Sequence, residues 1–237
     1  MMEVFAMDIS DEMMSARFER MLSWVSAEKR DRIHRFLRKE DALRSLGAEV
    51  LTRWLACNRL GLPNEALHFE QSPKGKPSIT GHSGLQFNIS HAGKWVVCAL
   101  DTVPVGIDIE EIRPIDVEVG RLCFSEQEFA TLMRQRSETE RLSYFYELWT
   151  LKESFAKADG RGISLPLKDV TFSEYVDSGI IHTAGWSSPF RYFKKYMIDE
   201  GYKAAVAAAH KEFPDTVRFI ACGNIDLSLY GSESGHA

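Results

Sequence analysis

One short strand-like segment of the chain carries two carboxylates on the same face. Apolar and polar side chains alternate over residues 105–110, and successive residues of a strand point to opposite faces. Asp108 and Glu110 therefore share a face, and Gly106 on that face leaves room beside them. Carboxylate oxygens are the ligands that a hard divalent cation such as Mg²⁺ prefers.

A second segment, residues 149–157, is helical in pattern and carries an acid and a base one turn apart. Positions four apart on a helix are neighbours, so Trp149, Glu153 and Lys157 form one row. Each segment alone has an ordinary explanation: two acids on a strand are usually a solvated edge, and a Glu–Lys pair is usually a surface pair worth about 0.2–0.5 kcal/mol. Facing each other, the two segments could hold a cation and a phosphate-bearing ligand.

The combination resembles the Sfp-type 4′-phosphopantetheinyl transferases. Gly-Ile-Asp-Ile-Glu (106–110), followed at this distance by Trp-x-x-Lys-Glu-Ser-x-x-Lys (149–157), resembles the signature of that family. Three further segments match it, at residues 74–77, 87–91 and 95–100. The resemblance spans nearly the whole chain and implies an α+β fold with two similar halves related by a pseudo-twofold axis.

The resemblance also implies an activity. Such an enzyme moves 4′-phosphopantetheine from coenzyme A to a serine of acyl or peptidyl carrier proteins and releases adenosine 3′,5′-bisphosphate. A non-catalytic homologue that only binds carrier proteins is the alternative, but it should have lost one or more of the three acids, and all three are present. A general nucleotide hydrolase would need a phosphate loop such as GxxxxGK[ST], and the sequence contains none.

Catalytic and metal-binding roles follow from the family resemblance, residue by residue. Asp108, Glu110 and Glu153 are expected to bind Mg²⁺, with Mn²⁺ an acceptable substitute. Glu110 is either a third ligand or holds a metal-bound water, and Glu153 is the leading candidate for the base that accepts the serine proton. Lys157 is expected to contact the transferred or leaving phosphate, and His91 a coenzyme A phosphate, so that both count with Glu153 as catalytic.

A larger set of basic and polar residues is expected to bind coenzyme A. The set is Lys29, Arg32, Arg44, Lys76, Ser90, His91 and Lys157. The first three belong to a strongly basic stretch, residues 29–44, which suits a small polyanion such as the 3′-phosphate. Most of that stretch could equally be the solvated face of a helix. The carrier protein is expected to dock at residues 121–124, where Leu122 and Phe124 are either exposed contacts or core residues.

The composition excludes several other classes of function. The 237 residues are 44% hydrophobic and 27% charged, as in ordinary globular proteins, and the net charge of −5 argues against nucleic-acid binding. No apolar run approaches the roughly 18 residues of a membrane span, and the N-terminus lacks the basic start of a signal peptide. Four scattered cysteines show neither metal spacing nor a disulfide pattern. We therefore expect a cytoplasmic protein. Its length favours the two-halved, monomeric type over the small trimeric holo-acyl-carrier-protein synthases.

We expect helices followed by strands, and this order occurs twice along the chain. The resulting division is an N-terminal α+β half over residues 1–103, a C-terminal α+β half over 104–225 that carries the acids, and a flexible tail over 226–237. Helical patterns cover residues 11–24, a stretch opened by Ser26, about 40–60, 129–133 and about 142–158. Ser10 or Asp11 could cap the first of these helices, and Ser125 with Glu128 forms a capping box that opens the fourth. The core side of the last is expected to carry Phe145, Leu148, Leu151 and Phe155. The stretch after Ser26 has Ile33, Phe36 and Leu37 as its apolar stripe. Residues 71–84 and 134–141 are expected to be loops.

Overall fold

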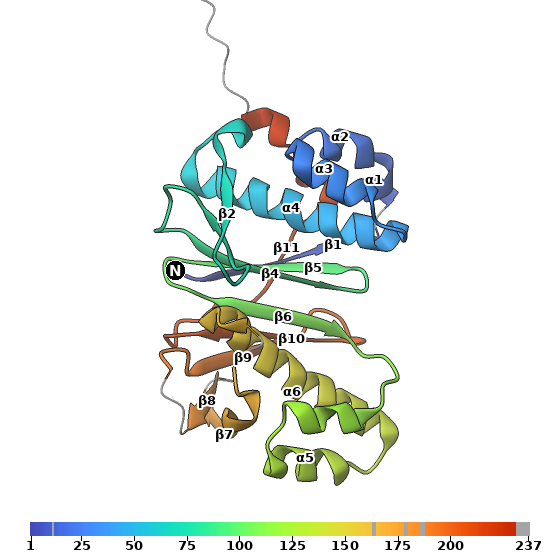
Figure 1. The fold of residues 1–237 in the computed structure, drawn as a ribbon, viewed down its shortest axis with the longest axis vertical. Coiled ribbons are helices and arrows are strands. Elements are labelled where there is room, and N and C mark those ends of the chain that lie inside the picture. The colour runs from blue at the N-terminus through green and yellow to red at the C-terminus, as the bar shows by residue number, and fades with distance from the viewer. Residues whose placement is uncertain (11, 163–164, 178–179, 185–187, 231–237) are drawn as a thin grey trace, which may run out of the picture.

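The structure is a computed structural model that describes residues 1–10, 12–162, 165–177, 180–184 and 188–230 (Figure 1). Two β-sheets face each other in the middle of the molecule, and one long helix covers the outer side of each sheet (Figure 1). The layers are held by an apolar core between the sheets and by one further core under each helix.

The first sheet has the strand order β11-β1-β5-β4. Its strands are β1 (Glu3–Asp8), β4 (Gln86–Ala92), β5 (Trp95–Asp101) and β11 (Arg218–Phe219). Neighbours in this sheet are antiparallel except for β11, which runs parallel to β1. A separate hairpin consists of β2 (Phe69–Gln71) and β3 (Pro77–Ile79).

The second sheet is antiparallel throughout and has the order β6-β10-β9-β8-β7. Its strands are β6 (Gly106–Glu111), β7 (Thr171–Asp177), β8 (Ile180–Ala184), β9 (Tyr192–Tyr196) and β10 (Tyr202–Ala208). As the alternation predicts, Ile107 and Ile109 of β6 point into the core between the sheets. Asp108 is on the other side of β6, together with Gly106.

Two helices of 22 residues form the outer layers: α4 (Lys39–Leu60) on the first sheet and α6 (Glu138–Asp159) on the second. Each ends at a glycine in the left-handed conformation, Gly61 with φ 66° and Gly160 with φ 76°. The shorter helices are α1 (Glu12–Ala16), α2 (Phe18–Leu22), α3 (Ala27–His34) and α5 (Glu126–Met133). None of the helices in the described ranges is long and apolar enough to cross a membrane.

Close packing of α6 on β6 depends on Gly106. A Cβ at this position would lie 2.0 Å from the Ser154 carbonyl oxygen and 2.4 Å from the Ala158 nitrogen, both in the α6 backbone. Any side chain there would push the helix away from the strand. The glycine thus brings Glu153 and Lys157 of α6 close to the carboxylates of β6.

The capping box predicted at the start of α5 is confirmed. The Ser125 hydroxyl accepts from the Glu128 N–H at 3.2 Å, and the Glu128 carboxylate accepts from the Ser125 N–H at 2.8 Å. The core side of α6 is also as predicted, because Phe145, Leu148 and Phe155 are buried.

Two predicted helices differ in their bounds from the observed ones. The first is split into α1 and α2 at Arg17, whose guanidinium instead donates to the carbonyl oxygens of Cys222 and Gly223. Residue 11, proposed with Ser10 as a cap, lies outside the described ranges. The helix α6 begins at Glu138 rather than near residue 142, because Ser137 caps it by accepting from the Glu140 N–H at 3.1 Å.

The apolar stripe predicted after Ser26 is wrong in part. Ser26 does cap α3 and Ile33 is buried, but the helix ends at His34. Phe36 and Leu37 follow in the connection to α4 and are exposed. The predicted loop 71–84 also contains β3, which pairs with β2. Of the predicted tail, residues 227–230 form a short 3₁₀ helix (Leu227–Tyr230), and residues 231–237 lie outside the described ranges.

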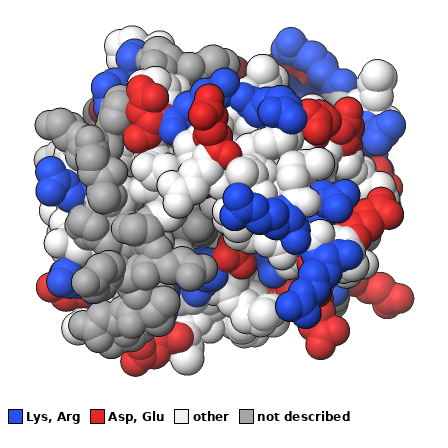
Figure 2. All heavy atoms as spheres, turned by 90° about the horizontal axis from the view of Figure 1, so that it is seen from below, with Lys and Arg blue, Asp and Glu red and all other residues white. Residues whose placement is uncertain are grey.

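Surface charge is mixed on the face shown in Figure 2, which lies at the bottom of Figure 1. Among the described residues visible there, Lys and Arg side chains are interspersed with Asp and Glu side chains.

Candidate active site

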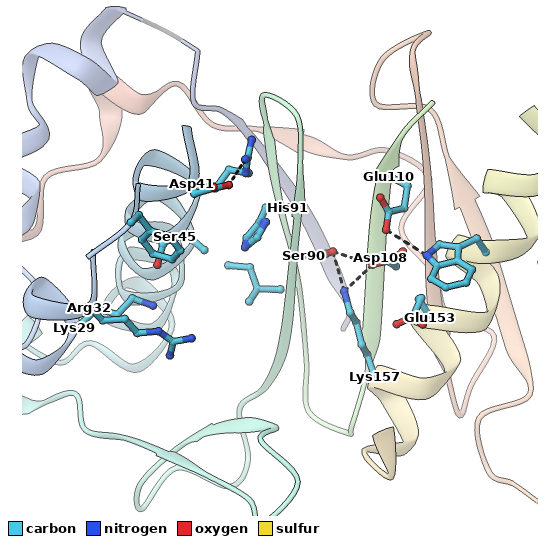
Figure 3. A pocket seen from close by; sticks show the side chains of 15 residues that line it. Lys29, Arg32, Asp41, Ser45, Ser90, His91, Asp108, Glu110, Glu153 and Lys157 are labelled. Carbon is cyan, nitrogen blue, oxygen red and sulfur yellow. Dashed lines mark hydrogen bonds and ion pairs between the residues drawn. The ribbon is translucent and has the colours of Figure 1, made fainter. Parts of the chain in front are cut away.

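A pocket of about 650 Å³ lies between the start of α4 and the acidic face of β6 and α6. Residues of α3 and α4 form one wall, those of β6 and α6 the opposite wall, and β4 lies between them (Figure 3). The site residues predicted from sequence that line it are Lys29, Arg32, Arg44, Ser90, His91, Asp108, Glu110, Glu153 and Lys157. Segments up to 128 positions apart in the chain, from Lys29 to Lys157, therefore meet at one pocket.

Asp108 lies at the centre of the polar contacts in this pocket. Its side chain is almost fully buried, and its Oδ1 accepts from the Lys157 ammonium at 2.6 Å and from the Ser90 hydroxyl at 2.9 Å. Lys157 also donates to the Ser90 oxygen at 2.8 Å. The second oxygen, Oδ2, is buried and has no hydrogen-bond partner. A buried carboxylate oxygen without a partner is costly and suits a bound cation or donor.

The other two predicted metal ligands are carboxylates whose ionisation is disfavoured. Burial, then the nearby Asp108 charge, raises the pKa of Glu110 to about 7. Burial and the same charge also raise the pKa of Glu153. The indole N–H of Trp149 donates to Glu110 at 3.3 Å and fixes its orientation. A positive charge placed among these acids would favour their ionised forms and so lower both pKa values.

The carboxylates do not form a closed metal site in this structure. Within the described ranges, no three Asp, Glu, His or Cys side chains converge at the spacing of metal ligands. One reason is that Asp108 is already paired with Lys157, and Glu110 is turned toward Trp149. The donor set nevertheless fits a hard cation, because it consists of carboxylate oxygens and one of them is buried without a partner.

His91 and Ser90 reach the pocket from β4, the edge strand of the first sheet. Burial lowers the pKa of His91, and the charges of Lys157, Arg44 and Lys29 lower it further. A neutral imidazole next to three cations can still donate one hydrogen bond to an anion. The two side chains leave opposite faces of β4, Ser90 toward Asp108 and His91 toward α4, and both line the pocket (Figure 3).

The basic residues on the opposite wall differ in how they are engaged. Lys29 is 3.5 Å from Glu49, and Arg32 projects toward the pocket beside it (Figure 3). Arg44 instead forms an ion pair with Asp41 and donates to the Gly93 carbonyl oxygen at 3.0 Å. It therefore holds the turn that follows β4 as well as lining the pocket.

Lys76 is the one predicted site residue that is not in the wall of this pocket. Its ammonium donates to the Ala158 carbonyl oxygen at 2.8 Å, at the C-terminal end of α6. Burial lowers its pKa. It lines an adjacent pocket of about 330 Å³ that shares Glu153 and Lys157 with the first. Lys76 therefore lies near Glu153 and Lys157 but lines a different pocket from the other predicted residues.

Two features of the site were not assigned from the sequence. Trp149 packs in the cleft wall by stacking on Phe145, and its indole N–H also donates to Glu110. Lys152, inside the matched motif, is fully buried and donates to Glu128 and to the Leu167 carbonyl oxygen, each at 2.8 Å. Its position next to Glu153, on the core side of the helix, could have indicated a structural role.

The predicted docking segment is divided between surface and core. Leu122 is 82% exposed, whereas Phe124 is buried against Phe145. Arg121 lies on the surface, paired with Glu118 at 2.6 Å and stacked over Phe129 at 4.0 Å. The segment therefore offers one apolar and one basic contact to a partner.

Comparison with known proteins identifies the family. The model described as the N-terminal part of 4′-phosphopantetheinyl transferase matches residues 12–103, and the model of the 4′-phosphopantetheinyl transferase superfamily matches residues 104–207. The chain is 38% identical to the 4′-phosphopantetheinyl transferase Sfp of Bacillus subtilis (strain 168), over 93% of this chain and 98% of that protein. It is 36% identical to the transferase ffp of Bacillus subtilis, over the same shares of the two chains.

A third relative, the transferase gsp of Aneurinibacillus migulanus, is 34% identical over 86% of this chain and 85% of its own. These matches confirm the family, the α+β fold class and the enzymatic activity predicted from the sequence. The chain belongs to the 4′-phosphopantetheinyl transferases, enzymes that transfer phosphopantetheine from coenzyme A to carrier proteins.

Proposed function

We propose that the pocket between α4 and α6 is the active site of this transfer. The observation that carries the proposal is Asp108: a buried carboxylate that uses one oxygen for Lys157 and leaves the other without a partner. Glu110 and Glu153 line the same wall of the pocket as Asp108, and basic residues line the opposite wall. This charge distribution suits a metal-bound pyrophosphate that lies between the two walls.

Asp108, Glu110 and Glu153 would hold Mg²⁺, and Mn²⁺ would be accepted by the same oxygen ligands. The raised pKa values of Glu110 and Glu153 support this assignment, because burial and the nearby Asp108 charge disfavour their ionised forms and a bound cation would offset both causes. When bound, the cation would neutralise charge on the pyrophosphate. Glu110 serves either as a direct ligand or through a bound water.

The reaction is attack of a serine hydroxyl of the carrier protein on the β-phosphorus of coenzyme A. A new bond forms between the serine oxygen and this phosphorus, while the bond between the phosphorus and the bridging oxygen of the pyrophosphate breaks. Adenosine 3′,5′-bisphosphate leaves with that oxygen. Glu153 accepts the serine proton, for which a carboxylate with a raised pKa is suited. Lys157 would stabilise the charge on the transferred or leaving phosphate.

The remaining predicted residues bind coenzyme A. Lys29 and Arg32 would contact the 3′-phosphate from α3, and Arg44 would contact the ligand from the same wall; all three line the pocket. His91 and Ser90 would donate to the pyrophosphate from β4, and Lys76 would contact the ligand from the adjacent pocket. Charge-assisted bonds of this kind are roughly twice as strong as neutral ones.

The organisation and setting of the enzyme belong to the same proposal. We infer acyl and peptidyl carrier proteins as acceptors and a monomeric, cytoplasmic enzyme. Its proposed halves are residues 1–103 and 104–225, followed by a tail over 226–237. The limits of the two family models support the division, and the buried thiols of Cys57, Cys98 and Cys123 suit a reducing compartment.

Mass spectrometry of intact carrier proteins tests the proposal. An apo acyl carrier protein and an apo peptidyl carrier domain would each be incubated with the enzyme, coenzyme A and Mg²⁺. We expect a mass gain of one phosphopantetheine on the serine, lost when Mg²⁺ is removed with EDTA and restored by Mg²⁺ or Mn²⁺. Transfer that survives complete removal of divalent cations would contradict the metal assignment but not the family.

A further inference from the structure

We propose that the connection between α3 and α4, residues 35–38, is a docking contact for the carrier protein on the first-sheet side of the pocket. This connection, Arg35, Phe36, Leu37 and Arg38, is called the rim loop below. The inference rests on the proposed function, because the occupant it names is the protein that supplies the acceptor serine.

The rim loop lies at the mouth of the active-site pocket. Phe36 lines the pocket, and so do Asp41 and Ser45 from the first two turns of α4. Lys29 and Arg32 of α3 line it from the other end of the loop (Figure 3). Leu37 follows Phe36 directly and points out to solvent, so it sits on the edge of the opening.

The apolar side chains of the rim loop are not used by the fold. Phe36 is 38% exposed and Leu37 is 102% exposed, which is the largest exposed fraction among the large hydrophobic residues described. The buried residue of α3 is Ile33, and the helix ends one residue later, at His34. A fully exposed leucine is common by itself, but here it adjoins a phenylalanine in the wall of the active site.

Basic side chains surround this apolar pair. Arg35 and Arg38 flank it in the loop, and Lys39 follows at the start of α4; all three are exposed. The first turn of α4 adds Glu40 and Asp41, but Asp41 is neutralised by its ion pair with Arg44. A partner that fits the rim loop therefore needs an apolar group within an acidic surface.

The reaction itself determines which partner covers the loop. The acceptor serine must reach Glu153 and Lys157 inside the pocket, so the surface of the carrier protein around that serine has to cover the opening. Residues on the rim are then within reach of any acceptor protein. An anionic membrane would also match the charge, but it has no part in presenting a serine to the pocket.

Two substitutions at Leu37 test the inference, with Leu229 as a matched control. Leu229 is 79% exposed, and the neighbouring Tyr230 hydroxyl donates to Asn58 near the far end of α4, a helix about 33 Å long by its 22 residues. Initial rates would be measured for wild type, Leu37→Ala, Leu37→Asp and Leu229→Asp, with an apo acyl carrier protein and an apo peptidyl carrier domain as substrates.

We expect the KM for at least one carrier to rise about fivefold for Leu37→Ala and about 20-fold or more for Leu37→Asp, with kcat and the KM for coenzyme A unchanged. The control Leu229→Asp should behave like wild type. Unaltered kinetics of Leu37→Asp with both carriers would overturn the inference, while a wild-type enzyme that modifies neither carrier would contradict the proposed function instead. Binding to anionic phosphatidylserine vesicles that is lost in Leu37→Asp, with carrier kinetics unaltered, would assign the rim loop to a membrane and also overturn it.

Discussion

The ammonium of Lys157 lies 2.6 Å from Oδ1 of Asp108, and the hydroxyl of Ser90 bonds to both groups. Lys157 belongs to α6 and Asp108 to β6, whereas Ser90 belongs to β4 in the other sheet. A second link is close by, because the Ile107 N–H donates to the Asn88 side chain at 2.9 Å. The acids and the groups proposed to bind phosphate thus come from both sheets and from α6.

The first prediction concerns the acids. Asp108→Ala or Glu153→Ala should lower turnover by roughly 10²-fold or more, because each removes an oxygen ligand of the proposed cation. Both side chains line a pocket rather than fill a core, so the variants should fold. Circular dichroism would check folding and the carrier mass assay would check transfer. Near-native turnover of a folded variant at saturating Mg²⁺ would be incompatible with the assignment.

The second prediction separates 3′-phosphate binding from other roles. Lys29→Ala or Arg32→Ala should raise the KM for coenzyme A by an amount equivalent to about 1.5–3 kcal/mol, and much less for dephospho-coenzyme A, which lacks the 3′-phosphate. Arg30→Ala, which removes a charge from the same helix at a residue outside the pocket wall, is the control. Equal effects on the two ligands would show that Lys29 and Arg32 do not bind the 3′-phosphate.

Arg44 is expected to behave differently from those two residues. Its guanidinium holds the Gly93 carbonyl oxygen and pairs with Asp41, so its loss should disturb the turn next to His91. Arg44→Ala should therefore weaken coenzyme A and dephospho-coenzyme A to a similar extent. Steady-state kinetics with both ligands would show it.

The local parts of the site could be predicted from the sequence. The strand alternation placed Asp108 and Glu110 correctly, and the helical spacing placed Glu153 and Lys157 in one row. Both periods are properties of a single element and need no knowledge of the rest of the fold. Gly106 was predicted only to leave room beside the acids, and the structure shows that the backbone of α6 fills this room.

Contacts between distant segments could not be predicted in this way. Lys76 caps the end of α6 from 82 positions away, and Arg44 reaches Gly93 across 49 positions. No periodic pattern encodes such pairs, since they depend on how the sheets and hairpins pack. The same limit explains Phe36 and Leu37: their spacing matched a buried helical stripe, but the helix ends at His34.

The third prediction concerns the pH dependence of stability. The pKa of Glu110 is raised to about 7 in the folded protein, above the ordinary value of 4.5, so ionising Glu110 costs folding free energy. Well below pH 4.5, Glu110 is protonated in the folded and in the unfolded protein, so it does not change the free energy of unfolding. As the pH rises from 4.5 through 7, the unfolded protein releases this proton first, and the free energy of unfolding falls. Glu110→Gln should therefore stabilise the metal-free protein at pH 8, by about 1–2 kcal/mol after discounting for solvent screening.

Urea unfolding in EDTA at pH 5 and pH 8 would measure this effect. The difference between Glu110→Gln and wild type should be larger at pH 8, and added Mg²⁺ should stabilise wild type more than the variant. If the variant is less stable than wild type at pH 8 without metal, ionised Glu110 does not lower the free energy of unfolding, and the prediction is wrong.

The fourth prediction concerns the buried lysine of the signature. Lys152→Met should destabilise the protein by about 3–5 kcal/mol, because it leaves the buried Glu128 carboxylate without its positively charged partner and removes one donor to the Leu167 carbonyl oxygen. Lys168→Met, at a nearby exposed position, should have little effect. Chemical unfolding would compare them. A Lys152→Met protein of native stability that has lost activity would instead give this lysine a chemical role.

The last prediction concerns carrier docking on the second-sheet side of the pocket. Arg121 and Leu122 are exposed at the end of the segment that follows β6, so they offer a cation and an apolar group to an acidic partner. Arg121→Glu should weaken binding of an acidic carrier protein while leaving the affinity for coenzyme A unchanged, because the residue is not in the pocket wall. The defect should shrink as salt is added, since like charges are then screened.

Arg59→Glu is the control: this arginine also sits in a surface ion pair, 3.3 Å from Glu3, but at the far end of α4. Titration of labelled carrier protein at low and high ionic strength would measure both variants, and unaltered binding of Arg121→Glu at low salt would exclude this surface.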